Sequence, residues 1–245
     1  MKDATDRNRT SPFAFTGNKF EFRMVGSQDS VSQPNVVLNT IVAEAFAEAC
    51  DELEKADDFD MAVHDLIKKY ATEHQRIVFN GNGYSDEWVK EAERRGLPNI
   101  KTMVESVECL TYDNTVEMFE KFDVFSRAEL ESRAEIKYEA YSKAINIEAR
   151  SMIDIASKHI IPAVIQYVTS LANSINQVKQ ASAVAYTGVQ EELLVQSADL
   201  LKDTKEALRA LETVVAEVPE TEGKEQAFFF MQKVVPAMEA LRKPV

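Results

Sequence analysis

The chain has 245 residues, of which 45% are hydrophobic, with 7 Gly and 7 Pro, so it is expected to fold and is neither fibrous nor wholly disordered. Its formal net charge is −13, from 41 acidic and 28 basic residues. This balance excludes the nucleic-acid binders and anionic-membrane binders that rely on basic patches, and leaves small molecules or proteins as partners.

Cys50 and Cys109 are far apart in the sequence and give neither a disulfide framework nor a zinc spacing. Both fall in helical apolar patterns, so we expect buried thiols. No apolar run approaches the roughly 18 residues of a membrane-spanning helix, and the first residues do not have the pattern of a signal peptide. We therefore expect a cytoplasmic protein with no membrane partner.

Charged and aromatic residues alternate in the string KFEFR at residues 19–23. Because successive side chains of a strand point to opposite faces, this pattern predicts a strand with Lys19, Glu21 and Arg23 on one face. That face can hold an anion and a metal side by side, or it can simply meet water, as in any amphipathic strand. Since nothing upstream looks able to supply partner strands, we expect this strand to be unpaired within the chain.

Two helices are predicted next, over residues 35–53 and 59–77, because apolar residues recur there every three or four positions. A charged break at residues 55–58 separates them. The run NGNG at residues 80–83 is a turn signal, and it lacks the Lys-Ser/Thr that a phosphate-binding loop needs.

A short helix is predicted to begin at Ser85, which can cap its first turn, and to end at Arg95-Gly96. A further helix is expected to begin near residues 112–114.

Long helices dominate the rest of the chain. The apolar spacing predicts helices over residues 126–159, 189–218 and 224–241, and a kink or restart at Pro162. Helical spacing also makes Tyr138, Tyr141 and Met152 core residues and not a ligand-binding set. The predicted fold is mainly α, a long antiparallel helical hairpin or bundle with a short N-terminal α+β remnant.

Several of these strings resemble a known family. NRTS at residues 8–11, KFEFR at 19–23 and Pro34-Asn35 resemble the end of the glutamine synthetase catalytic domain. Three longer strings are similar to the type III branch of that family: DRNRTSPFAFTGNKFEFR (6–23), VFNGNGYSDEWVKEAERRGL (78–97) and RAEIKYEAYSKAINIEARSMIDIASKHIIPAV (133–164). The chain is identified as a C-terminal part of a type III enzyme, with the end of the catalytic domain at 1–77 and the helical region at 78–245.

The resemblance implies an ATP-dependent ligase that joins glutamate and ammonia through a γ-glutamyl phosphate, with Mg²⁺ or Mn²⁺, in a homo-oligomer. By the same resemblance, Glu21 matches a metal ligand, Arg23 a contact to glutamate, Lys19 a basic residue near the nucleotide and Arg9 a contact to the transferring phosphate. Type I enzymes carry a second arginine where this chain has Ala14, and Arg7 is an alternative source of that charge.

One carboxylate and three basic residues cannot hold two metals and ATP, so we expect the isolated chain to be inactive. The alternative function is a non-catalytic helical module for oligomerisation or interaction. A third hypothesis is a related ligase that joins glutamate to another amine.

Overall fold

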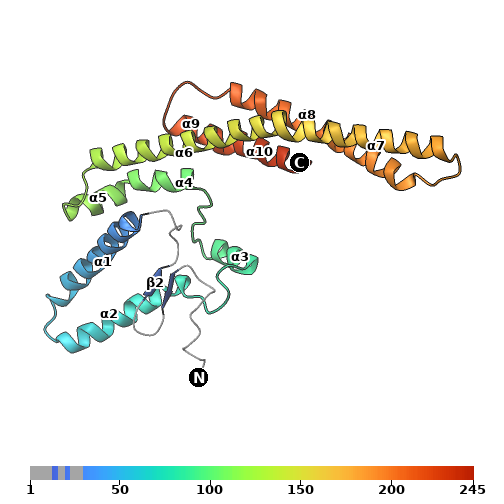
Figure 1. The fold of residues 1–245 in the computed structure, drawn as a ribbon. Coiled ribbons are helices and arrows are strands. Elements are labelled where there is room, and N and C mark those ends of the chain that lie inside the picture. The colour runs from blue at the N-terminus through green and yellow to red at the C-terminus, as the bar shows by residue number, and fades with distance from the viewer. Residues whose placement is uncertain (1–12, 16–19, 23–29) are drawn as a thin grey trace. The chain divides into compact units, whose positions relative to one another are not determined.

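The computed structural model of the chain describes residues 13–15, 20–22 and 30–245 (Figure 1). The described part is mainly α-helical, as the sequence predicts. Its strands are β1 (Phe13–Phe15) and β2 (Phe20–Phe22), and its helices are α1 (Ser32–Leu53), α2 (Phe59–Glu73), α3 (Asp86–Arg94), α4 (Met103–Glu108), α5 (Asp113–Lys121), α6 (Arg127–Ile155), α7 (Ile161–Ala181), α8 (Gly188–Ala216), α9 (Lys224–Phe229) and α10 (Val235–Arg242). Two 3₁₀ turns, η1 (Gln75–Ile77) and η2 (Cys109–Thr111), and two π-helical turns, η3 (Ala156–Ile160) and η4 (Phe230–Val234), complete the set of described helical elements.

The chain divides into two compact units. The first unit contains residues up to 102 together with 112–127, and the second contains 103–111 together with 128–245. The two units are defined by which residues lie close together in space. The predicted boundary between residues 77 and 78 was drawn instead between two stretches of sequence that resemble different regions of the family, so the unit division does not test it. That boundary therefore stays a prediction.

In the first unit, β1 and β2 form a two-stranded antiparallel sheet. The strand predicted around Glu21 is confirmed, but the expectation that nothing upstream pairs with it is wrong, because β1 lies only a few residues before it. A tight hairpin needs no distant segment to supply a partner. The sheet is small, and Phe20 is 61% exposed, so this aromatic side chain does not anchor the strand in a core.

Ion pairs join the helices of the first unit. The Lys69 ammonium pairs with Glu52, between α2 and α1, and Lys121 Nζ lies 2.6 Å from Glu44 Oε2, between α5 and α1. The only buried residue of α1 is Thr40, and its Phe46 is 67% exposed. Ion pairs between partly exposed groups contribute little to stability. Few apolar side chains of this unit are buried among its described residues, namely Leu66, Ala92, Val116 and Phe119.

The loop before α3 is fastened to that helix. Ser85 caps the first turn, because its Oγ accepts a hydrogen bond from the Trp88 amide at 3.3 Å, as the sequence predicts. The helix ends at Gly96, which has a φ of +69°, while the Leu97 amide donates to the Ala92 carbonyl at 2.9 Å. These are the bonds of a glycine-terminated helix end, so both predicted ends of α3 are confirmed.

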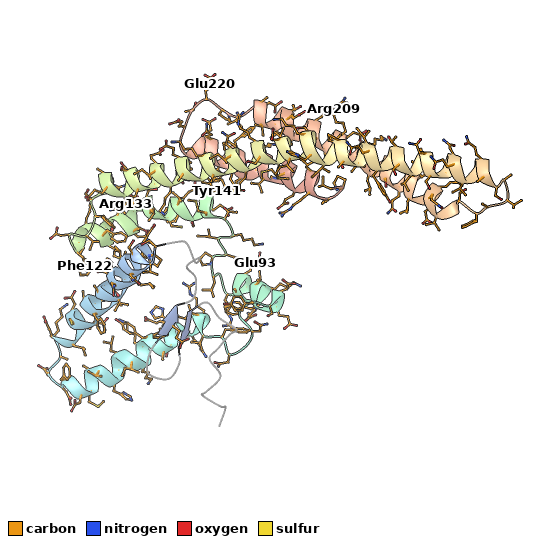
Figure 2. The ribbon with its side chains drawn as sticks, viewed as in Figure 1. Glu93, Phe122, Arg133, Tyr141, Arg209 and Glu220 are labelled. Atoms are coloured by element: carbon orange, nitrogen blue, oxygen red, sulfur yellow. The ribbon has the colours of Figure 1, made fainter. Side chains whose placement is uncertain are left out.

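The second unit is organised around one long helical run, from α6 through η3 into α7 (Figure 1). The chain then turns back and α8 packs along α7, after which η4 and α10 pack against α8, and α9 contacts α4. The largest cluster of buried residues joins these elements, with Ala149, Ala156, Leu208, Leu211, Phe230, Val234 and Leu241 at its centre. Tyr138 is buried and Tyr141 and Met152 pack against buried clusters, which confirms that they are core residues; Figure 2 labels Tyr141 on α6.

Prolines follow both π-helical turns of the second unit. Pro162 stands two residues after η3, and Pro236 two residues after η4. Proline has no amide hydrogen, and its ring crowds the carbonyl four residues before it, so a wider turn relieves the clash without ending the helix. The break predicted at Pro162 is therefore a π turn within a continuing helix.

The prediction of buried thiols is wrong for both cysteines. Cys50 is exposed on α1 and Cys109 is half-buried, and both are free. An apolar helical pattern predicts burial only where another element covers that face. Helix α2 packs against α1, but Cys50 lies on a side of α1 that remains exposed among the described residues.

Candidate functional site

The candidate site predicted from the sequence lies around β2, and Glu21 is its described member. Glu21 stands at the centre of β2 and is half-buried, with Phe20 exposed beside it. Because neighbouring side chains of a strand point to opposite faces, this carboxylate lies on the face opposite the Phe20 ring. A carboxylate is an oxygen donor of the type that Mg²⁺ and Mn²⁺ prefer.

The strand register sets Glu21 directly opposite Ala14 on β1. Residue 14 is the position at which type I glutamine synthetases, by the resemblance described above, carry a second arginine. The structure therefore makes that position a neighbour of Glu21, and the alanine there supplies no positive charge.

Arg9, Lys19 and Arg23, the other predicted site residues, lie outside the described residues, as does Arg7. Of the four predicted site residues, the structure describes Glu21 alone. Their roles stay predictions.

Among residues 13–15, 20–22 and 30–245, no group of three or more His, Cys, Asp or Glu side chains is placed to hold a metal ion. Divalent magnesium needs several oxygen ligands in octahedral geometry, and one carboxylate does not provide them. The described residues alone do not form a complete metal site. Glu21 has the chemistry of one ligand, and the other ligands of such a site would have to come from outside the described residues.

The sequence analysis recognised the string at residues 78–97 but missed the role of Arg95. Its guanidinium donates to the Arg76 and Val78 carbonyls at 3.1 and 2.9 Å and to Glu91 Oε1 at 2.5 Å. The Phe79 and Trp88 rings stack with centroids 4.1 Å apart. These partners all lie in the loop and helix next to Arg95, so the role of Arg95 is structural. The only sequence signal for this role is the Arg-Arg-Gly end of the helix that carries the lone tryptophan.

Two hollows lie in the second unit. One of about 150 Å³ lies among Ile160, Tyr167, Leu200 and the last residues of the chain, and a shallower one lies beside Lys224 and Phe228. Both have mainly apolar walls, and the only ionisable side chains that line them, among the described residues, are those of Tyr167, Lys224 and Glu225. Neither hollow resembles a catalytic pocket.

Comparison with known proteins shows which family this chain resembles. A sequence model described as "Glutamine synthetase C-terminal domain" matches residues 62–179. The "Type-3 glutamine synthetase" of Dictyostelium discoideum is 38% identical over 253 residues, which cover 99% of this chain. The chain belongs to the glutamine synthetase family. The predicted identity as a C-terminal part of a type III glutamine synthetase is confirmed.

Two bacterial glutamine synthetases agree with this assignment. The enzyme of Bacteroides fragilis is 33% identical and that of Butyrivibrio fibrisolvens is 36% identical, each over 99% of this chain. The chain spans about a third of the length of these relatives, namely 34% of the first two and 35% of the third. Glutamine synthetases are ligases, so the chain belongs to an enzyme family. Within the described residues, no helix is long and apolar enough to cross a membrane.

Proposed function

We propose that this chain serves a type III glutamine synthetase that makes glutamine from glutamate, ammonia and ATP through a γ-glutamyl phosphate. The observation that carries the proposal is similarity over 99% of the chain to proteins named glutamine synthetase, together with a glutamate on a short strand at the position of the family motif. In this proposal the chain contributes the end of the catalytic domain, residues 1–77, and the helical region, residues 78–245.

Four residues are proposed to act in the complete enzyme. Glu21 would supply one oxygen to a Mg²⁺ or Mn²⁺ ion, and Arg23 would bind the glutamate substrate. Lys19 would lie near the nucleotide and Arg9 near the transferring phosphate. ATP and the divalent cation are proposed cofactors, because phosphoryl transfer needs cations to offset the charge of the phosphate oxygens.

The isolated chain is proposed to be inactive. The described residues offer too few metal ligands, and its relatives are roughly three times as long. The exposed apolar side chains of α1 and α2, such as Phe46 and Ile67, also support a place for this unit within a larger domain, since isolated proteins rarely leave such residues uncovered in number. We further propose a cytoplasmic location and a homo-oligomeric state.

A chimera tests the proposal directly. The last third of the Dictyostelium discoideum type-3 enzyme would be replaced by residues 1–245, and ATP-dependent glutamine formation would be assayed with glutamate, ammonia and Mg²⁺ or Mn²⁺. We expect an active chimera whose activity falls at least about a hundredfold on Glu21→Gln. The matched control is Glu93→Gln on α3, which is expected to leave the activity unchanged.

A folded chimera without activity, or one that tolerates Glu21→Gln, would contradict the proposal. Detectable glutamine formation by the purified 245-residue chain would contradict only the proposal that the isolated chain is inactive. An active chimera that accepts another amine in preference to ammonia would favour the related ligase.

The second candidate, a non-catalytic helical module, rests on the extended second unit and its exposed apolar residues. It would be favoured if the chain assembles stably by itself while the chimera has no activity.

A further inference from the structure

The short helix α4 belongs to one unit of the molecule, while the chain on both sides of it belongs to the other. Residues up to 102 and residues 112–127 form part of the first unit, whereas residues 103–111, which contain α4 and η2, fall in the second. The chain therefore leaves the first unit after residue 102, passes through α4 and returns at residue 112. A segment that is tied at both ends to one unit and packed in the other can link the states of the two units.

Apolar contacts hold α4 in the second unit. Val104 is 0% exposed and Val107 is 3% exposed. Figure 1 shows α4, in green, alongside the first part of α6. The two valines form a buried cluster with residues of α6 and α9, namely Ala134, Tyr138 and Ala227.

This cluster, the α4 cluster, is distinct from the main core of the second unit. Among the described residues the two clusters have no buried residue in common, although Tyr141 packs against both. The main cluster takes its buried residues from α6, η3, α8, η4 and α10. The main core therefore does not depend on the presence of α4.

One ion pair fastens the end of α4 to the start of α9. Lys224 Nζ lies 2.5 Å from Glu108 Oε1, and the same ammonium lies 5.8 Å from the centroid of the Phe228 ring. The Lys224 and Glu108 side chains are 58% and 30% exposed, so the pair contributes little by itself. Because both groups reach solvent, substitutions can break this contact and restore it without burying a lone charge.

The helix that follows α4 is fixed in the first unit. Val116 and Phe119 of α5 are each 1% exposed, and Lys121 of α5 pairs with Glu44 of α1. Helix α1 is the next element in the chain after β2, the strand that carries Glu21. A continuous set of contacts thus leads from the α4 cluster, through α5, to the helix that follows the strand of the proposed metal ligand.

We propose that α4 is a latch, a segment that docks on the second unit and can be released from it, and that it couples the two units. While α4 is docked, the helical region restrains α5 and α1 of the first unit. When α4 is released, the main core stays folded and the first unit loses this restraint. The latch rests on the packing alone, whereas its effect on glutamine formation rests on the proposed ligase function.

Hydrogen exchange of the complete chain, followed by mass spectrometry, tests the latch. We expect the amides of residues 103–111 to be protected in the unaltered chain and to exchange at least about tenfold faster in Val107→Asp, because a carboxylate opposes burial. Residues 204–211 of α8, in the main core, should keep their protection. The matched control is Val195→Asp on α8, where the valine is 60% exposed; it should leave the exchange of residues 103–111 unchanged.

A charge exchange keeps the proposal open to contradiction if Val107→Asp also alters folding. Glu108→Lys should speed the exchange of residues 103–111 about two- to fivefold, because it sets two like charges together at the end of α4. Adding Lys224→Glu to Glu108→Lys should restore the original rate, since the pair is re-formed with its charges reversed. Glu117→Lys on α5, at an exposed position, is the control for the change in net charge.

Trp88 reports whether the latch couples the units. Trp88 lies in the first unit and Val107 in the second, yet Val107→Asp should lower the urea concentration at which Trp88 fluorescence changes, and Val195→Asp should not. In the active chimera, Glu108→Lys should lower glutamine formation about twofold or more, and the exchanged pair should restore it.

Unprotected amides at residues 103–111 of the unaltered chain would overturn the latch. Loss of protection at residues 204–211 in Val107→Asp would also overturn it, because α4 would then be part of the main core, as would an exchanged pair that stays as fast as Glu108→Lys alone. An unchanged Trp88 transition in Val107→Asp would overturn the coupling. A chimera without activity would count against the proposed ligase function alone, since hydrogen exchange decides the latch independently.

Discussion

The guanidinium carbon of Arg95 lies 5.4 Å from the centroid of the Trp88 ring, and the Nη1 atom of the same guanidinium donates hydrogen bonds to the backbone carbonyls of Arg76 and Val78. One side chain at the end of α3 thus binds both the helix and the loop that precedes it. Trp88 is the single tryptophan of the chain, so its fluorescence reports on this part of the first unit alone.

Replacing Arg95 should loosen the loop before α3. We expect Arg95→Met to lower the stability of the first unit by about 1–2 kcal/mol, since the two carbonyls lose their donor. Urea unfolding followed by Trp88 fluorescence measures the change. Arg94→Met is the control: Arg94 is exposed and bonds to Glu91 without contacting the loop, so a loss as large as that of Arg95→Met would count against this role.

Acid should weaken the same region. Hydrogen bonds from Arg94 and then Arg95 lower the pKa of Glu91 from 4.5 to about 2. Because the folded-state pKa lies below the unfolded one, the stabilising contribution is complete above about pH 4.5 and is lost as the pH falls toward about 2. Trp88 fluorescence in urea at a series of pH values should show this loss, and Glu91→Gln should show a smaller pH dependence between these limits. An identical pH dependence in the two proteins would contradict the assignment.

Gly96 is needed for its backbone conformation. Its φ of +69° lies in the left-handed region, and no atom lies within 4 Å of the position that a Cβ would occupy. Gly96→Ala should therefore cost about 1 kcal/mol through backbone strain alone, and Gly96→Asn less, because asparagine tolerates this region better. Urea unfolding followed by Trp88 fluorescence distinguishes the two variants, and equal losses would argue against the conformational explanation.

Ser142 on α6 is 1% exposed, and its Oγ has no hydrogen-bond partner among the described residues. A buried hydroxyl without a partner carries an uncompensated desolvation penalty, so Ser142→Ala should stabilise the second unit by about 1 kcal/mol.

The matched control for Ser142 is Thr204→Val on α8. The Thr204 hydroxyl is also buried, but it donates to the Leu200 carbonyl at 2.7 Å, so its removal should not stabilise the unit. Thermal unfolding followed by circular dichroism compares the two variants. A destabilised Ser142→Ala protein would contradict the prediction.

The sequence by itself determined the features that depend on neighbouring residues. The Ser85 cap, the glycine stop at Gly96 and the irregularity near Pro162 follow from local backbone chemistry, so they were predictable at the level of single positions. The long helices were predictable as well, because a three-and-four spacing of apolar residues persists over many turns. The family strings were equally local, and they identified Glu21 as the residue to examine.

Only the tertiary structure decided which apolar positions are covered. Leu193 and Leu208 are both leucines of α8, yet Leu193 is 38% exposed, whereas Leu208 is fully buried in the cluster to which η4 and α10 contribute. The exposure of Cys50 was decided in the same way, by the absence of an element that covers its side of α1 among the described residues. Burial depends on contacts between distant segments, and a helical pattern specifies a face without specifying what meets it.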